Sequence, residues 1–308
     1  MSARRRDDRP GGLVIVDKPA GVSSHDVVNR LRQLAGTRRV GHAGTLDPLA
    51  TGVLVIGVGQ ATRLLHHLVL EDKAYRATIR LGAATVSDDA DGALLSRADA
   101  SHLDIESVHA AMQQFVGSFP QVPSAVSAVK VAGTRSYARV RAGESVQLAP
   151  RTISVTDFQP LSATHRSSYF DVEVSVECST GTYVRALARD LGERLSVGGH
   201  LVALRRTRVG PFNATRALTV NQLAERADPV VLPLSEAVRE LFPVRLITRE
   251  QAEQLSYGRF LEPVGIHGIY AVLLADGTVI GLLREFDSAT ARGGGLFARP
   301  IVVWHARE

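Results

Sequence analysis

The sequence predicts an α+β protein built around a mixed, mostly antiparallel β-sheet, with a small β-rich module at the C-terminus. Three observations support this class. The chain has 308 residues, which is longer than a typical single domain. Segments with a strand pattern outnumber helical ones, and the two kinds do not alternate regularly. Residues 171–178 alternate strictly between polar and apolar side chains, as expected for a strand with one buried face.

The first part of the chain is expected to contain two strands, one helix and one loop. Residues 11–19 read as a short buried strand that ends at a proline. Ser24 is predicted to cap a helix with one apolar stripe, and Gly36 is predicted to end it. Residues 37–52, rich in glycine and polar residues, should form a structured loop before a core strand at 53–56.

The middle of the chain is expected to be rich in strands, with two helices. Strands are predicted at 73–81, 124–130, 151–158, 169–178 and 200–209. Helical spacing of apolar residues predicts one helix over 104–115 and another from Gly181 to Gly198. Residues 83–92 should form a loop, and 131–150 an insertion between two strands.

The residue pattern of the C-terminal part predicts a separate small module. Pro233 and Pro243 bracket a helical connection, followed by a short helix over 249–255. Short strands are expected near 269–274, 279–283 and 297–303. We therefore divide the chain into a basic tail (1–10), a large domain (11–244) and a β-rich module (245–308).

The distribution of charge favours a nucleic-acid partner. The chain carries a net charge of +5, and residues 245–308 contribute equal numbers of arginines and acids, so the excess lies in residues 1–244. Only Lys18, Lys73 and Lys130 are lysines; the other basic residues are arginines, which suit bidentate phosphate contacts. A charge of this size is also compatible with a role in solubility alone.

Several compositional features exclude other classes of protein. No apolar run approaches the length of a membrane span, and no signal-peptide pattern is present, so we expect a soluble, cytoplasmic protein. The single cysteine, Cys178, excludes an internal disulfide and cysteine-rich zinc sites. Motifs of P-loop nucleotide hydrolysis, zinc proteolysis and serine hydrolysis are absent.

One His, one Asp and two Thr lie within a single segment of twelve residues. This segment is Gly41-His42-Ala43-Gly44-Thr45-Leu46-Asp47-Pro48-Leu49-Ala50-Thr51-Gly52. On residue types alone, Asp47-Pro48 could simply start a turn. However, residues 41–54 resemble motif II of the TruB family, the tRNA pseudouridine-55 synthases, with the pattern G-H-x-G-T-L-D-P-x-A-T-G-V-L met at every fixed position.

Two further blocks extend the resemblance to about residues 11–215. Residues 18–26 are similar to the K-P-x-G-x-T-S-x-D opening of the family and depart from it at Ser23, where the family has threonine. Residues 178–185 resemble C-S-x-G-T-Y-[IV]-R of motif III. The resemblance implies a pseudouridine synthase fold, and by position and pattern a PUA-like RNA-binding domain at 245–308.

The resemblance also implies the chemistry, in which uridine of the tRNA T-arm is flipped out and its glycosidic bond is moved from N1 to C5. It makes Asp47 the catalytic carboxylate, which is ionised at neutral pH, with Arg185 beside it to favour that charged state. No cofactor or metal is implied, because isomerisation exchanges no electrons. The remaining implied residues are Tyr75 stacking on the uracil, Tyr183 and Leu204 lining the pocket, His42 where the flipped nucleotide left the stack, and Lys18 supporting the loop.

Some expectations go beyond the catalytic pocket. Arg135, Arg139 and Arg141 of the insertion are candidates for contacts with RNA phosphates. We expect a monomer with no obligatory protein partner. Two alternatives remain at this point: a non-catalytic tRNA-binding or tRNA-folding protein on the same scaffold, and an enzyme that depends on a guide RNA, as some relatives of the family do.

Overall fold

The computed structural model describes residues 11–126, 130–131, 134–135, 148–287 and 295–304. The predicted tail, residues 1–10, lies outside these ranges. The helices are α1 (Ser24–Ala35), α2 (Leu65–Leu70), α3 (Ile105–Met112), α5 (Val184–Arg194), α6 (Val220–Ala224), α7 (Leu234–Leu241) and α8 (Arg249–Ser256). The strands of the large sheet are β1 (Gly12–Lys18), β2 (Val40–Ala43), β3 (Thr51–Val58), β4 (Lys73–Leu81), β7 (Gly117–Gln121), β10 (Arg151–Arg166), β11 (Tyr169–Cys178), β12 (Gly199–Val209), β13 (Phe212–Asn213) and β14 (Leu232–Pro233).

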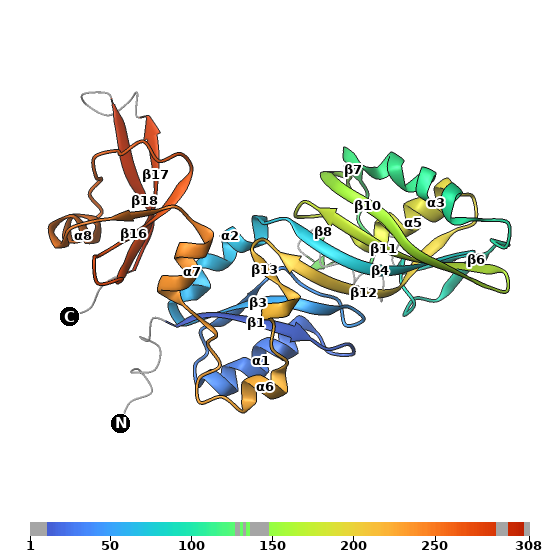
Figure 1. The fold of residues 1–308 in the computed structure, drawn as a ribbon, viewed down its shortest axis with the longest axis horizontal. Helices are drawn as coiled ribbons and strands as arrows, with labels where there is room; N and C mark the ends of the chain where they lie inside the picture. Colours follow the sequence, from blue (N-terminus) through green and yellow to red (C-terminus); the bar gives the residue numbers. More distant parts are fainter. Residues whose placement is uncertain (1–10, 127–129, 132–133, 136–147, 288–294, 305–308) are drawn as a thin grey trace.

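The large sheet, as far as the structure describes it, has ten strands and extends from the end of the molecule with α3 to the neighbourhood of α7 (Figure 1). Its main path is β14-β1-β3-β12-β4-β11-β10-β7, with β2 added beside β3 and β13 beside β12. Strands β12 and β3 pair in parallel, and the other described pairs of this sheet are antiparallel. The predicted mixed, mostly antiparallel sheet is therefore confirmed.

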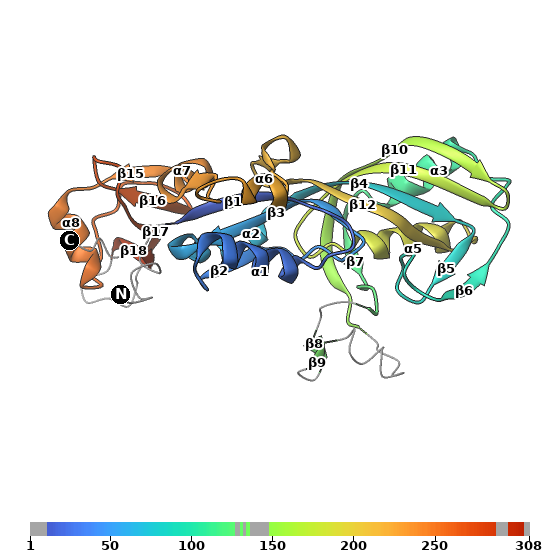
Figure 2. The ribbon, with the colours of Figure 1, turned by 90° about the horizontal axis from the view of Figure 1, so that it is seen from below.

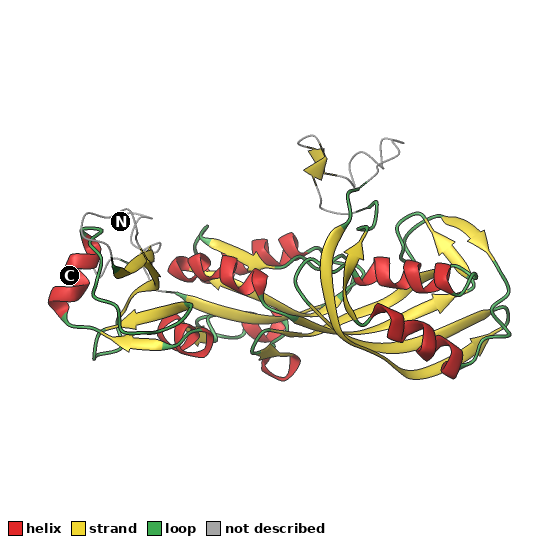
Figure 3. Ribbon diagram, turned by 90° about the horizontal axis from the view of Figure 1, so that it is seen from above, coloured by secondary structure: helices red, strands yellow, loops and turns green. Residues whose placement is uncertain are grey.

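Helices cover the sheet at both ends because the strands there carry apolar side chains. Helices α3 and α5 pack on β4, β10 and β11 and form one core with them. At the β1–β3 end, α1 and α6 pack on one set of strand side chains, and α2 and α7 pack on another. Strands β1 and β3 are thus buried on both faces, which explains their continuous apolar runs. Figure 3 shows the helices arranged along the strands.

A second sheet lies at the end of the elongated molecule that carries the C-terminus (Figure 2). It contains β15 (Val244–Leu246), β16 (Ile269–Leu273), β17 (Val279–Asp287) and β18 (Leu296–Val303) in that order. Trp304 follows β18, is 2% exposed, and donates a hydrogen bond from Nε1 to the carbonyl oxygen of Gln60 at 3.2 Å. Apolar residues of this sheet share a core with α2 and α7, so the module packs directly on the large sheet.

Most predicted elements are confirmed, and some have the predicted bounds. Strands β4 and β11 begin and end where the alternation indicated. The valines of β11 and Cys178 are buried as predicted. Helices α1, α3, α5, α7 and α8 also form in the predicted regions.

Two predicted loops contain strands. Residues 37–52 include β2 and the first two residues of β3, and β2 pairs with the later part of β3, from Val40–Val58 to Ala43–Val55. Residues 83–92 include β5 (Ala83–Thr85), which pairs with β6 (Leu94–Arg97). Both predictions were wrong because glycines and short polar residues suggested turns, whereas the next strand along the chain supplies the hydrogen bonds.

The predicted strands on either side of the insertion differ from the observed ones. Residues 124–126 form no strand, and β7 lies earlier, at residues 117–121, where it pairs with β10. Strand β10 continues to Arg166, well past the predicted end at 158, because β11 pairs with it as far as Tyr169. Pro160 is accommodated next to an irregularity in that ladder. The described part of the insertion contains the short pair β8 (Lys130–Val131) and β9 (Thr134–Arg135).

Candidate active site

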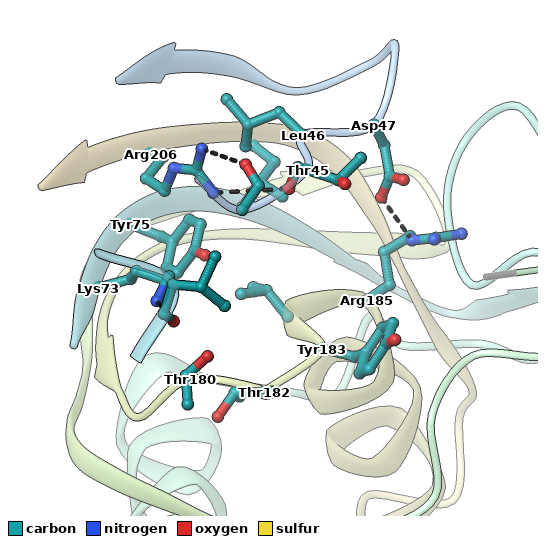
Figure 4. A pocket seen from close by; sticks show the side chains of 15 residues that line it. Thr45, Leu46, Asp47, Lys73, Tyr75, Thr180, Thr182, Tyr183, Arg185 and Arg206 are labelled. Carbon is teal, nitrogen blue, oxygen red and sulfur yellow. Dashed lines mark hydrogen bonds and ion pairs between the residues drawn. The ribbon is translucent and has the colours of Figure 1, made fainter. Parts of the chain in front are cut away.

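A pocket of about 250 Å³ opens where the loop between β2 and β3 faces β4, β12 and the beginning of α5 (Figure 4). Five residues predicted to act at the site line it together: Asp47, Tyr75, Tyr183, Arg185 and Leu204. Segments that are far apart in sequence are brought together here by the parallel pairing of β12 with β3.

Asp47 and Arg185 form an ion pair at the pocket, with 3.1 Å between Oδ2 and Nε. The Arg185 side chain is 7% exposed, whereas the Asp47 side chain is 43% exposed. Other bonds hold the guanidinium in place: Nη1 donates to Asp89 Oδ2 at 3.1 Å, and Nη2 donates to the carbonyl of Val126 at 2.8 Å. A fixed, buried cation thus faces a carboxylate that solvent and ligands can reach.

Lys18 supports the loop that carries Asp47. Its side chain is fully buried, and Nζ donates to the carbonyl oxygens of Val22 at 2.7 Å and Pro48 at 3.4 Å. Burial lowers the pKa of Lys18 to about 8, an effect that the nearby Asp47 carboxylate opposes. The contact with Pro48, the residue after Asp47, is consistent with the predicted supporting role.

Ser24 holds the same loop from helix α1, which corrects its predicted role as the helix cap. The cap is Ser23, whose side chain accepts from the backbone N–H of Asp26, while the Asp26 carboxylate accepts from the N–H of Ser23. Ser24 is buried in the first turn instead. Its Oγ accepts from the N–H of Leu46 at 2.8 Å and donates to the carbonyl of Leu46 at 2.9 Å.

The aromatic and apolar walls come from three elements. Tyr75 lies on β4 and is 8% exposed, and burial raises the pKa of its hydroxyl, which keeps that group neutral. Tyr183 directly precedes α5, and its backbone N–H and carbonyl both bond the side chain of Gln121. Leu204 lies on β12, and its carbonyl accepts from Thr51 Oγ1 at 3.4 Å.

His42 does not line the pocket. It lies on β2 opposite Ile56 of β3, and its buried Nδ1 has no hydrogen-bond partner among the residues that the structure describes. Burial lowers the pKa of His42, which favours the neutral ring. Its predicted contact with the RNA near the flipped nucleotide stays a prediction.

Sequence reasoning missed two buried cations of the pocket, Lys73 and Arg206. Arg206 donates from Nε to the carbonyl of Val53 at 2.7 Å and from Nη2 to the carbonyl of Gly44 at 2.9 Å. Lys73 stands in phase with Tyr75 on the buried face of β4. A lysine on the apolar face of an alternating strand is the signal that could have identified it.

The predicted phosphate contacts lie mostly outside the described residues. Arg139 and Arg141 fall in the range 136–147, for which no structure is described, and Arg135 is placed only as the backbone of β9. Within the described segments, no group of three or more His, Cys, Asp or Glu side chains is arranged to hold a metal ion. Every helix in those segments is too short or too polar to span a membrane.

Comparison with known proteins gives matches along most of the chain. Three family profiles match in succession: TruB family pseudouridylate synthase (N terminal domain) at residues 32–184, tRNA pseudouridylate synthase B C-terminal domain at 185–239, and tRNA Pseudouridine synthase II, C terminal, at 242–293. The chain is 56% identical to a tRNA pseudouridine synthase B of Nocardia farcinica, over 91% of this chain and 92% of that protein. It is 52% identical to the corresponding protein of Thermobifida fusca, over 95% and 98%.

Solved structures support the fold independently. A chain from an H/ACA RNP bound to a substrate RNA containing 2'-deoxyuridine superposes with a TM-score of 0.71 at 22% identity, covering 100% of this chain and 89% of that one. A chain from an archaeal box H/ACA sRNP Nop10–Cbf5 complex gives 0.69 at 24% identity, covering 97% and 89%. Together with the identity to the curated relatives, these matches establish that the chain belongs to the TruB family of pseudouridine synthases and has the fold of that family.

Proposed function

We propose that this protein converts the uridine at position 55, in the T-arm of tRNA, to pseudouridine, with Asp47 as the catalytic carboxylate. Isomerisation of uridine in tRNA follows from membership of the family and from the similarity to tRNA pseudouridine synthase B along nearly the whole chain. The observation that carries the assignment of Asp47 is its ion pair with the buried Arg185 at the pocket.

The shape of the pocket suits a base that has left the helical stack. An enzyme that acts on a paired or stacked nucleotide must first extrude it, and pocket contacts offset the few kcal/mol that unstacking costs. The ring of Tyr75 and the side chain of Leu204 supply flat and apolar walls, and Asp47 stands at the opposite side of the pocket from Tyr75 (Figure 4). A flipped uridine held by these walls would present its ribose and glycosidic bond to the carboxylate.

An ionised carboxylate serves each first step that leads to pseudouridine. Asp47 would attack uracil C6, attack ribose C1′ or remove the proton from C2′, and each of these acts needs the negative charge. Arg185 pairs with that charge and fixes one carboxylate oxygen. The other oxygen is left for the substrate. The exposure of Asp47 therefore fits a reacting group better than a purely structural ion pair.

The wider molecule supports binding to a folded RNA. The excess of positive charge lies outside residues 245–308, so we propose that residues 11–244 form the catalytic domain and contribute most of the attraction to phosphates. Residues 245–308 would act as a PUA-like module that contacts RNA mainly by shape and hydrogen bonds. Only tRNA is needed as a partner for this reaction, and we propose that the protein acts as a monomer in the cytoplasm.

Replacement of the proposed catalytic group tests the function directly. Asp47→Asn should abolish isomerisation while tRNA affinity stays within a few-fold of wild type, because the amide keeps the shape of the side chain and loses its charge. The measurement is primer-extension mapping of pseudouridine in an unmodified tRNA transcript, with dissociation constants from filter binding. Asp99→Asn, on the exposed surface, serves as the matched control.

Each outcome of this experiment has a clear meaning. Modification by wild type at another uridine of the transcript would contradict the assignment to position 55. Substantial turnover by Asp47→Asn would remove Asp47 as the catalytic residue. Tight tRNA binding by a wild-type protein that forms no pseudouridine would favour the non-catalytic binding protein instead.

A further inference from the structure

Lys73 and Arg206 form a cationic side of the pocket, which the proposed roles of Asp47 and Arg185 leave without a function. Lys73 begins β4 and is 6% exposed, and Arg206 lies near the end of β12 and is 1% exposed. Both flank Gly44: a Cβ added there would lie 3.4 Å from Arg206 Nη1 and 3.7 Å from Lys73 Cε. Figure 4 shows them together with Tyr75, across the pocket from Asp47.

Both charges lack a carboxylate partner within the part of the chain that the structure describes. Lys73 Nζ donates to the carbonyl oxygens of Val69, at 2.9 Å, and Glu71. Arg206 bonds the carbonyls of Val53 and Gly44. An ammonium group has three N–H donors, so one donor of Lys73 remains available beside the pocket that Lys73 lines.

A buried cation without a counterion carries a desolvation cost. Burial, reinforced by the charge of Arg206, lowers the pKa of Lys73 to about 8, so the side chain is still mostly protonated at neutral pH. The pocket therefore has the ion pair of Asp47 and Arg185 on one side and two positive groups without a carboxylate partner on the other. The electric field of the two positive groups favours any reaction in which electrons move from the side of Asp47 towards the side of Lys73.

We propose that Lys73, together with Arg206, stabilises the negative charge that develops on the uracil ring when its bond to the ribose breaks. This inference rests on the proposed function, because it assumes that a flipped uridine lies with its ribose towards Asp47. The uracil oxygens would then lie towards the cationic side. An N–H donor of Lys73 directed at a uracil oxygen would be strongest when that oxygen carries charge.

The electron balance is the same for the three first steps available to Asp47. The electron pair of the C1′–N1 bond passes to the uracil as that bond breaks, or, if Asp47 adds to C6, a pair moves from the C5–C6 bond onto the C4 carbonyl. The base is anionic in each case. When C5 then bonds C1′, any bond from Asp47 to C6 or C1′ breaks and returns its electron pair to the carboxylate, and a proton taken from C2′ goes back to C2′. The base loses the proton of C5 and N1 ends protonated, so no oxidant or reductant is required.

The test compares two leaving groups. Fluorine at C5 withdraws electrons, so the anion of 5-fluorouracil is intrinsically more stable than that of uracil and depends less on the enzyme. Single-turnover rates would be measured on a tRNA with uridine or 5-fluorouridine at position 55, as disappearance of the starting nucleoside after digestion and liquid chromatography. Lys73→Met should slow uridine conversion about 10²–10³-fold. The factor by which Lys73→Met slows conversion of 5-fluorouridine should be at least about tenfold smaller than the factor for uridine.

Controls separate charge from packing. Lys73→Arg keeps the charge, so the ratio of the two rates should stay at the wild-type value even if packing lowers both. Arg76→Met removes an exposed positive charge from the same strand and should also leave the ratio unchanged. Circular dichroism and tRNA affinity would establish that each variant is folded and binds.

The outcomes distinguish this inference from the function on which it rests. A wild-type protein that does not modify position 55 would contradict the proposed function. An active wild type with a Lys73→Met variant that loses the same factor on both substrates, or loses nothing, would overturn the role of Lys73. If Lys73→Met does not fold, a Lys73→Arg variant with an altered rate ratio would overturn it as well.

Discussion

The two charged side chains of the Asp47–Arg185 pair differ in what the fold does to them. Arg185 is fixed by four acceptors, which are the carboxylates of Asp47 and Asp89 and the carbonyls of Ser87 and Val126. Asp47 has one oxygen on Arg185, and its side chain is 43% exposed. A group that reacts with the substrate must keep part of its hydrogen-bonding capacity free of protein partners. A group that orients the reacting group is held more firmly when all of its donors have partners.

Substitutions of Tyr75 separate stacking from proton transfer at the scale of a single residue. The ring contributes about 1–3 kcal/mol of stacking to a flipped base. Tyr75→Phe keeps the ring and should retain most binding of the flipped base, whereas Tyr75→Ala should lose both binding and turnover. Dissociation constants and single-turnover rates of both variants provide the measurement.

The pattern of the two variants decides between roles. If Tyr75→Phe were as inactive as Tyr75→Ala yet bound tRNA normally, the hydroxyl would take part in proton transfer, with C5 as the site that gives up a proton. A Tyr75→Ala variant equal to wild type in both quantities would leave Tyr75 as a packing residue only.

At the scale of secondary structure, helix α1 and the pair β12–β3 hold the loop of Asp47 from two sides. Ser24 bonds Leu46 from the helix, and Arg206 bonds Gly44 from the strand. Gly52 permits the parallel approach of β12, because a Cβ there would lie 2.2 Å from the carbonyl oxygen of Arg206 and its φ is +95°. The loop is therefore irregular in conformation and fixed in place.

Neighbouring serines of α1 provide a matched pair of variants. Ser23→Ala removes a helix cap and should lower the free energy of unfolding by about 1 kcal/mol with little effect on turnover. Ser24→Ala leaves the buried N–H and carbonyl of Leu46 without their partner, which should cost about 1–3 kcal/mol. It should also lower the rate, because Asp47 follows Leu46 directly. Urea denaturation and single-turnover assays measure the two effects.

Equal rates for Ser24→Ala and Ser23→Ala, at their different stabilities, would mean that the Ser24 contacts stabilise the fold without positioning Asp47.

At the scale of the whole molecule, an elongated shape combines with an uneven distribution of charge. The four-stranded sheet is attached through Trp304 and an apolar core shared with α2 and α7, so it extends the molecule along its long axis (Figure 2). A long molecule suits an elongated RNA such as a tRNA arm. The net charge of +5 provides sequence-independent attraction to its phosphates.

Salt dependence measures that attraction. The affinity for tRNA should fall steeply with salt. Replacing Arg135, Arg139 and Arg141 together by alanine should reduce the slope of log K against log salt by about one for each phosphate that the protein no longer neutralises. A control with the exposed Arg30, Arg97 and Arg226 replaced removes the same charge elsewhere. An unchanged slope in the first variant would exclude the insertion from the interface.

Local patterns were sufficient to predict many elements of this fold. The alternation in β4 and β11 and the apolar spacing of α1 and α5 are properties of consecutive residues, and the structure has these elements as predicted. The resemblance of residues 41–54 and 178–185 to two family motifs named residues that meet at the pocket. Patterns of this kind are visible in the sequence because they depend on neighbours along the chain.

The elements that were missed depend on contacts with another segment, which the residue pattern of one segment does not show. Strand β2 exists because β3 pairs with it, and β10 extends to Arg166 because β11 continues beside it. The role of Ser24 depends on Leu46, because the Ser24 side chain bonds the backbone of that residue instead of capping the helix.

The sequence by itself determined the family, the ionisable residues and the strands with strict alternation. Only the tertiary structure decided which charges meet. The pairing of β12 with both β3 and β4 puts Arg206 beside Lys73 and opposite Asp47, at separations in sequence that no local pattern spans. Burial then gives those charges their effect, because a cation removed from water acts on its neighbours far more strongly than one at the surface.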